Sequence, residues 1–186
     1  MNNNTKLRKV ELRNELLGII LNISDKQEKS QSIVRRLLLL PEISHSKSIL
    51  LFSPGQNEVD ISRLFSIFQK EKKKVFLPSV NNLIITQITP KTKLISRSFG
   101  ILEPSIRAQE NPEGIDLAVI PGLGFDRNGG RLGHGIGWYD KLFSKVKVKC
   151  KIGVCFNEQI ISEVPLESHD KMMNIIITEK EIIYPF

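Results

Sequence analysis

The sequence predicts an α/β fold: a single-domain, three-layer sandwich over residues 1–186, in which a mostly parallel open sheet carries helices on both faces. Short apolar runs bounded by turn residues recur from residue 48 onward, and each has the length of a strand. An amphipathic stretch at 61–69 separates the first two runs, which gives the strand, helix, strand order of a parallel sheet.

The first helix is expected at residues 6–21. Its apolar side chains recur at helical spacing, namely Leu12, Leu16, Ile19 and Ile20. Steps of three and four residues align three basic side chains on another face of the same helix: Lys6, Lys9 and Arg13. Like charges in such a column repel one another, so an isolated helix gains no stability from them.

The remaining elements follow from the same reasoning. A second helix is expected to begin at Ser24, with Gln27 as its capping-box partner, and to stop at Pro41. Strands are expected at 48–52, 75–77, 83–88, 117–120, 151–156 and 174–178, with a candidate edge strand at 181–184. The lysine-rich run at 70–74 is interpreted as the solvated end of the helix at 61–69.

The composition is that of a folded domain, because 40% of the 186 residues are hydrophobic and 25% are charged, which excludes disordered and fibrous proteins. Two cysteines, Cys150 and Cys155, are too few for a disulfide framework and lack the spacing of a zinc or redox motif, which favours the reducing cytoplasm. The longest apolar run, 37–40, is too short to span a bilayer, and the N-terminus has no apolar signal segment. We therefore expect a cytoplasmic protein with no membrane partner.

The net charge of +7 is unevenly distributed along the chain. Residues 1–74 carry 14 basic and 8 acidic side chains, whereas residues 75–186 carry 13 and 12. A basic excess of this kind favours an anionic partner.

The most informative segment is 121–140, which contains seven glycines, leaves the end of an expected buried strand and enters an expected helix near Gly137. Glycines let the backbone approach a ligand closely, and the N–H groups at a helix N-terminus favour a phosphate. Arg131 can contact phosphate oxygens, and Asp140 can hold a Mg²⁺ ion that bridges them. The segment lacks the Gly-Lys-Ser/Thr ending of a Walker loop, and it follows a late strand, which excludes the dinucleotide fingerprint.

The segment resembles the 5-formyltetrahydrofolate cyclo-ligase family, also called methenyltetrahydrofolate synthetases. The resemblance covers residues 9 to about 178. Its motifs are Pro121-Gly122, Phe125-Asp126, the run from Arg131 to Gly137, Tyr139-Asp140, Lys9-x-x-Leu12-Arg13, Asn57-Glu58-Val59-Asp60 and His169-Asp170.

The resemblance implies that 5-formyltetrahydrofolate is converted to 5,10-methenyltetrahydrofolate with ATP and Mg²⁺, and that ADP and phosphate are released. In the family's mechanism, the formyl oxygen attacks the γ-phosphorus to give an N5-iminium phosphate, and N10 then closes the ring. Such chemistry depends on positioning and on neutralising phosphate charge, and it needs no nucleophilic side chain. We also expect a monomer that acts on a folate, with or without a polyglutamate tail.

The matching positions imply roles for individual residues. Arg131 and Lys9 would be catalytic, and the metal ligands would be Asp140 and Asp170. The ATP site would comprise Lys9, Arg13, Arg131, Leu132, Gly133, His134, Gly135, Ile136, Gly137, Trp138 and Tyr139. The folate site would comprise Glu58, Arg13, Phe99, His134 and Trp138. The sequence leaves open whether Phe99 and Phe125 line a pocket or belong to the core, and a turn is the alternative for Asp170.

Two other functions remain as alternatives. An open sheet of this kind also suits a sugar-phosphate isomerase or a CoA-transferase-like enzyme that acts without ATP. The basic charge suggests a nucleic-acid-binding module, but only 6% of the residues are aromatic and no recognisable nucleic-acid motif is present. We therefore expect no nucleic-acid partner.

Overall fold

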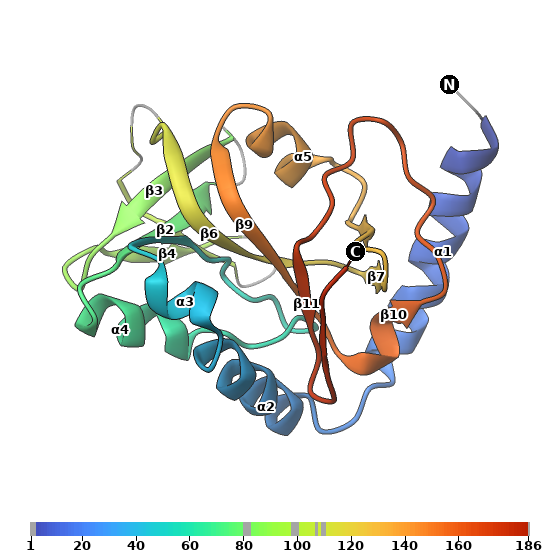
Figure 1. Cartoon of the computed structure of the whole chain (residues 1–186), viewed down its shortest axis with the longest axis horizontal. Coiled ribbons are helices and arrows are strands. Elements are labelled where there is room, and N and C mark those ends of the chain that lie inside the picture. Colours follow the sequence, from blue (N-terminus) through green and yellow to red (C-terminus); the bar gives the residue numbers. More distant parts are fainter. Residues whose placement is uncertain (1–2, 80–82, 98–100, 107, 109–110, 186) are drawn as a thin grey trace.

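The computed structural model describes residues 3–79, 83–97, 101–106, 108 and 111–185, and within them the central element is a seven-stranded sheet (Figure 1). Its strands, in spatial order, are β12 (Ile182–Ile183), β11 (Ile175–Ile177), β9 (Lys147–Val154), β6 (Gly114–Pro121), β1 (Ser48–Leu50), β2 (Lys74–Ser79) and β3 (Ile84–Ile88). The five inner strands are parallel, and the two edge strands are antiparallel to their neighbours. The predicted mostly parallel α/β fold is confirmed.

Helices cover both faces of this sheet, but unequally. One face packs on α2 (Lys26–Leu38), α3 (Pro41–His45) and α4 (Arg63–Lys70), which lie together below the sheet in Figure 1. The other face packs on α5 (Trp138–Phe143) and on Phe125. Because side chains alternate along a strand, Ile49 of β1 faces the first layer and Leu50 faces the second.

The glycine-rich segment forms strands of its own, which the sequence did not predict. A three-stranded sheet joins β10 (Ile160–Ile161), β7 (Gly124–Asp126) and β8 (Arg131–Leu132), and the short 3₁₀ helix η2 (Asn157–Gln159) precedes β10. The long helix α1 (Asn3–Leu21) packs beside this sheet through Leu12, Leu16 and Ile20. A further pair, β4 (Leu94–Ser96) and β5 (Leu102–Pro104), lies next to β2.

The prediction of which α1 side chains are buried is wrong in one respect. Lys9 is only 7% exposed and lies on the buried stripe with Leu12 and Leu16, whereas Ile19 is 42% exposed. Arg13 is half-buried beside the same stripe. The reason is tertiary, because polar groups of two distant segments receive Lys9 and Arg13, as described below.

The limits of α2 also differ from the expectation. The N-cap is Asp25, which has a φ of 55° and makes no side-chain capping hydrogen bond, so the expected capping box of Ser24 and Gln27 is wrong. The helix ends at Leu38, and Pro41 begins α3 instead of only ending α2. Proline is well tolerated in the first turn of a helix, where its missing N–H would have no helical partner.

The run at 70–74 is not simply the solvated end of a helix. The side chain of Lys73 is 9% exposed, and its ammonium donates to the carbonyl oxygens of Ile43, Ser44 and Ser46 at 2.9, 3.0 and 2.8 Å. Lys73 therefore satisfies carbonyl groups at the end of α3. Lys74 already belongs to β2.

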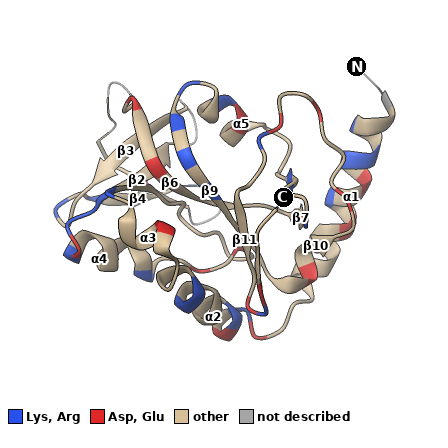
Figure 2. Ribbon diagram, in the orientation of Figure 1, with Lys and Arg blue, Asp and Glu red and all other residues tan. Residues whose placement is uncertain are grey.

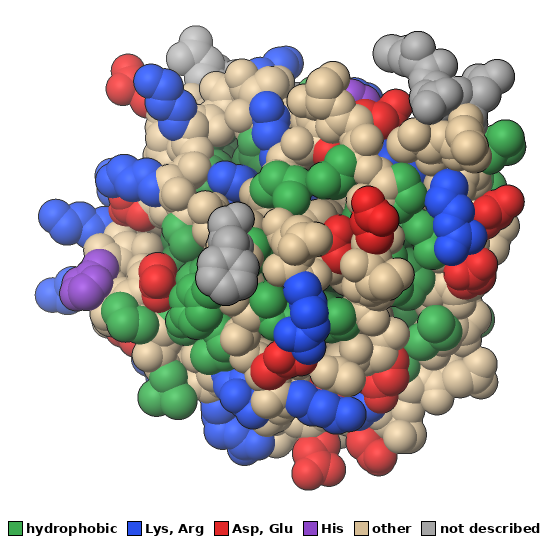
Figure 3. Space-filling view, turned by 45° about the vertical axis from the view of Figure 1, so that its right-hand side comes forward, with side chains coloured by type: hydrophobic (Ala, Val, Ile, Leu, Met, Phe, Trp, Pro, Cys, Tyr) green, Lys and Arg blue, Asp and Glu red, His purple; other side chains and the backbone are tan. Residues whose placement is uncertain are grey.

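Charged residues are spread over the molecule. Figure 2 shows basic residues on α1, α2, β9 and the end of α4. On the face drawn in Figure 3, charged side chains of both signs alternate with hydrophobic ones. Within the described residues, none of the helices combines the length and apolar character needed to cross a bilayer.

Candidate active site

A cavity of about 270 Å³ opens where β1 and β6 end, between α1, the glycine-rich segment and the loop at 167–170. Open parallel sheets place their ligands at this edge. Each of the predicted site residues within the described part of the chain lines this cavity. Phe99 lies outside the described residues.

The hairpin of β7 and β8 positions Arg131. Its turn is closed by Asp126, a buried residue whose Oδ1 accepts the N–H groups of Asn128 and Gly130, each at 2.9 Å. Asp126 Oδ2 accepts the N–H of Val164 at 2.8 Å, which ties the turn to the loop that leads to Asp170. The Phe-Asp motif therefore has a structural role in the turn.

Arg131 is held on three sides, with a side chain that is 7% exposed. Its Nη1 donates to the carbonyl of Pro121 at 3.3 Å, and its Nη2 donates to Asp140 Oδ2 at 3.3 Å. The guanidinium lies over the ring of Tyr139, 5.2 Å from its centroid. Burial raises the pKa of Tyr139 well above its usual value, so this hydroxyl stays neutral.

The loop at 133–137 needs glycine at two positions with positive φ, Gly135 at 99° and Gly137 at 64°. Arg13 Nε donates to the carbonyl of Gly133 at 2.9 Å. A Cβ atom at Gly135 would lie 3.4 Å from Cζ of Arg13. Arg13 and the loop are thus packed together, with His134 and Ile136 exposed at the rim of the cavity.

Lys9 is enclosed by two carboxylates on the loop at 167–170. Its ammonium donates to Asp170 Oδ2 at 2.6 Å and to Glu167 Oε2 at 2.9 Å. Burial alone would lower the pKa of Lys9, but the hydrogen bonds to Asp170 and Glu167 outweigh it and raise the pKa above 10.5. Lys9 is therefore protonated.

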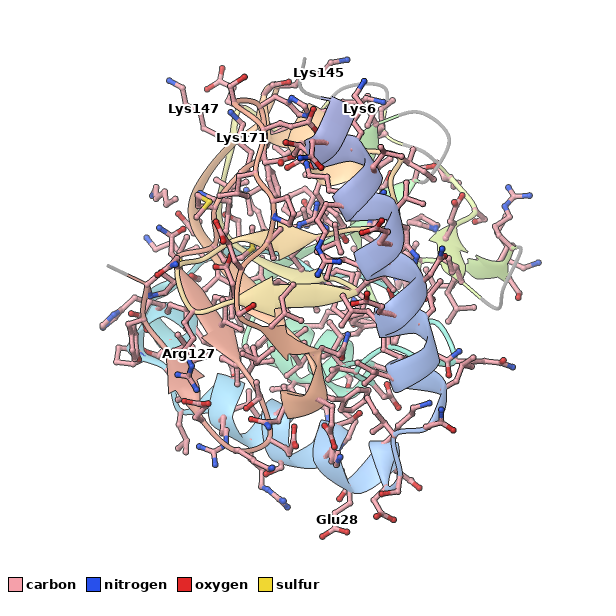
Figure 4. All side chains as sticks on the ribbon, turned by 90° about the vertical axis from the view of Figure 1, so that its right-hand side faces the viewer. Lys6, Glu28, Arg127, Lys145, Lys147 and Lys171 are labelled. Carbon is pink, nitrogen blue, oxygen red and sulfur yellow. The ribbon has the colours of Figure 1, made fainter. Side chains whose placement is uncertain are left out.

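Sequence reasoning missed Glu167, because no motif distinguishes it from other loop carboxylates. Sequence reasoning also set Lys6 in one column with Lys9 and Arg13. Lys6 is exposed, lies at the upper end of α1 in Figure 4, and is not among the described residues that line the cavity.

On the opposite wall, Glu58 reaches the cavity from the loop that follows β1. Its Oε2 accepts the N–H of Gly55 at 2.8 Å, which holds the carboxylate at the end of the strand. Its Oε1 lies 3.9 Å from Nε2 of His134, so the glycine-rich segment and the post-strand loop meet here.

The aromatic residues divide between cavity and core. Phe125 is completely buried in the core beside α5, where a Cβ at Gly153 would come within 2.4 Å of its ring. Trp138 lines the cavity and meets Tyr139 edge to face at 5.0 Å. Its indole Nε1 is buried and has no hydrogen-bond partner within the part of the chain that the structure describes.

The chemistry of Asp140 and Asp170 fits a Mg²⁺ ion. Both carboxylates are largely buried at the cavity, and Mg²⁺ is usually held by one or two such groups together with substrate phosphates and water. Asp140 Oδ1 accepts the N–H of Lys171 at 3.0 Å, which orients it. Among the described residues, no group of three or more His, Cys, Asp or Glu side chains is arranged to hold a metal ion.

Comparison with known proteins agrees with this geometry. A model of the 5-formyltetrahydrofolate cyclo-ligase family matches residues 5–179. A relative from Schizosaccharomyces pombe, named "Probable 5-formyltetrahydrofolate cyclo-ligase", is 29% identical over 199 residues, which cover 95% of this chain and 98% of that protein.

Two solved structures are similar to the whole fold. The NMR structure of Aquifex aeolicus 5,10-methenyltetrahydrofolate synthetase has a TM-score of 0.82 and 34% identity, covering 95% of this chain and 92% of that one. The 5,10-methenyltetrahydrofolate synthetase of Mycoplasma pneumoniae has a TM-score of 0.68 and 26% identity, covering 92% of this chain and 98% of that one. Since the family match includes every segment that builds the cavity, the chain belongs to the 5-formyltetrahydrofolate cyclo-ligase family.

Proposed function

We propose that this protein converts 5-formyltetrahydrofolate to 5,10-methenyltetrahydrofolate in a reaction that consumes ATP, requires Mg²⁺ and releases ADP and phosphate. One observation carries the proposal: three cations from two segments, Lys9, Arg13 and Arg131, converge on one cavity. Two carboxylates suited to Mg²⁺, Asp140 and Asp170, line the same cavity. The names of the relatives support the folate substrate.

The cations would bind the triphosphate, and Arg131, held against Tyr139 and Asp140, would neutralise charge that develops on the transferred phosphate. Lys9 would act beside it. Mg²⁺ held by Asp140 and Asp170 would neutralise further charge on the phosphate oxygens.

Glu58, across the cavity, would accept hydrogen bonds from the aminopyrimidine edge of the pterin, and Trp138 would offer an aromatic face for stacking. The loop at 133–137, with His134 at its rim, would contact both substrates. The formyl oxygen would attack the γ-phosphorus to give an N5-iminium phosphate and ADP. Ring closure by N10 would then release the former formyl oxygen as part of inorganic phosphate.

Three further properties belong to this proposal. The whole chain would form one catalytic domain that acts as a monomer, on folates with or without a polyglutamate tail. The free thiols of Cys150 and Cys155 are compatible with work in the cytoplasm.

The test is an absorbance assay of the methenyl product with purified protein, 5-formyltetrahydrofolate, ATP and Mg²⁺. We expect product only when both ATP and Mg²⁺ are present, and ¹⁸O in the formyl group should appear in the released phosphate. Arg131→Ala and Asp140→Ala should each abolish turnover without unfolding the protein, whereas Arg35→Ala, on the exposed face of α2, should remain active. Product formation at the same rate without ATP would refute the ATP-dependent reaction, and no product under any of these conditions would refute the proposed activity.

A further inference from the structure

The carboxylates around Lys9 exceed what one ammonium group needs. A single carboxylate neutralises a buried lysine, yet Lys9 contacts both Glu167 and Asp170. Their side chains are 23% and 14% exposed, against 9% for that of Lys9. The second carboxylate therefore requires an explanation.

Both carboxylates lie on one closed turn. The N–H of Asp170 donates to the carbonyl of Glu167 at 3.0 Å, and the N–H of Glu167 donates to Asp170 Oδ2 at 2.8 Å. Asp170 Oδ2 thus accepts from Lys9 and from the backbone at once, whereas Oδ1 lies 3.7 Å from Nε2 of His169. Asp170 is oriented by the turn and keeps one oxygen for another ligand.

The charge of the cavity points to what that ligand is. Apart from the two histidines, three cations face four carboxylates in the lining: Lys9, Arg13 and Arg131 against Glu58, Asp140, Glu167 and Asp170. A triphosphate entering a cavity with this excess of negative charge is repelled unless a divalent cation enters with it. Under the proposed function, Asp170 would bind that cation.

A divalent cation on Asp170 weakens the attraction between Asp170 and Lys9. Water compensates little for this loss, because the side chain of Lys9 is only 9% exposed. A buried ammonium without a carboxylate partner is strongly destabilised. Glu167, 2.9 Å from the ammonium, remains as its partner.

We propose that Glu167 is a positioning residue, which holds the Lys9 ammonium at the phosphate site while Asp170 binds the metal ion. This inference rests on the proposed function, in which Lys9 contacts ATP. Glu167 acts through Lys9 and touches no reacting atom. No sequence motif predicted a role for Glu167.

The experiment compares Glu167→Ala and Glu167→Gln with Glu163→Ala, an exposed carboxylate four residues earlier in the same loop. The first measurement is independent of catalysis: acetylation of Lys9 in the nucleotide-free protein at saturating Mg²⁺, where Asp170 would bind the metal ion, followed by mass spectrometry with exposed Lys145 as the internal reference. The second is binding of a non-hydrolysable ATP analogue at several Mg²⁺ concentrations, measured by calorimetry. Thermal melting identifies any variant that fails to fold.

We expect Glu167→Ala to increase acetylation of Lys9 and to weaken nucleotide binding about 10-fold to 100-fold, the usual effect of losing such a supporting group. Glu167→Gln keeps a hydrogen-bond acceptor for Lys9, so it should recover part of both losses, and the KM for the folate should stay within about twofold.

Unchanged acetylation of Lys9 in folded Glu167→Ala would overturn the inference. Full recovery of nucleotide binding at high Mg²⁺ would also overturn it, because Glu167 would then be a metal ligand. Increased acetylation with unchanged nucleotide affinity would support the positioning of Lys9 by Glu167 and refute the role of Lys9 in ATP binding.

Discussion

Asp126 is the residue on which the glycine-rich hairpin depends most. Its carboxylate accepts three backbone N–H groups, and the bonds to Gly130 and Val164 are buried. These bonds close the turn before Arg131 and join it to the segment that leads to Asp170. The turn and the loop are 38 residues apart between Asp126 and Val164, so no local preference can replace the contact.

Replacing Asp126 by Ala leaves two buried N–H groups without an acceptor. Hydrogen bonds to a charged group contribute about 1.5–3 kcal/mol each, and the two buried bonds are expected to account for most of the loss, so the free energy of unfolding should fall by about 3–5 kcal/mol. Asp126→Asn is expected to be less destabilising. Its carbonyl oxygen can still accept the N–H of Gly130, whereas its NH₂ group cannot accept the N–H of Val164. We expect a loss of about 1.5–3 kcal/mol for that variant.

Urea denaturation followed by far-ultraviolet circular dichroism measures these losses. The matched control is Asp60→Ala, since Asp60 is an exposed carboxylate that accepts a single backbone N–H, from Ser62. The control should lose about 1 kcal/mol or less. If Asp126→Ala lost no more than the control, the structural role assigned to this carboxylate would be refuted.

Three further predictions concern stability. Lys73→Met should lose about 1–3 kcal/mol in urea denaturation because three carbonyl groups lose the ammonium donor and, within the described residues, only that of Ile43 keeps a backbone donor, the N–H of Ser46. Lys70→Met, at an exposed position, should stay within about 0.5 kcal/mol of the parent; equal losses would contradict the capping role. Gly137→Ala should lose about 1–2 kcal/mol because of its φ of 64°, and Gly137→Asn should lose less, as thermal melting can check; a neutral Gly137→Ala would argue against the left-handed conformation. The hydrogen bond from Lys149, followed by those from backbone groups, lowers the pKa of Asp116 in the folded state below its ordinary value of 3.8, so this carboxylate stabilises the fold above that pH and the stabilisation is lost as pH falls below it. Asp116→Asn should therefore be less stable than the parent at pH 7, with a difference that shrinks below about pH 4, and a difference independent of pH would contradict this assignment.

The elements with a strong local signal could be predicted from the sequence. Runs of β-branched and aliphatic residues predict inner strands because such strands are buried on both faces, and the structure confirms the parallel sheet. The glycine-rich segment, Arg131 and Asp140 were identifiable because their chemistry lies within 20 consecutive residues, 121–140. The family resemblance drew on four such local motifs, and the comparisons confirm it.

What the sequence could not determine is how distant groups meet. Helical periodicity places Lys9 relative to Leu12, but it does not say which face of α1 is covered. The ammonium is buried because Glu167 and Asp170 lie beside it, 158 and 161 residues further along the chain.

The sequence by itself therefore determined the fold class, the family and the residue types of the site. Only the tertiary structure decided that Lys9 is enclosed by carboxylates, that Asp126 closes a hairpin and that Lys73 completes α3. The physical reason is that strand and helix periods are local properties, whereas the environment of a buried charge depends on partners that the whole fold brings together.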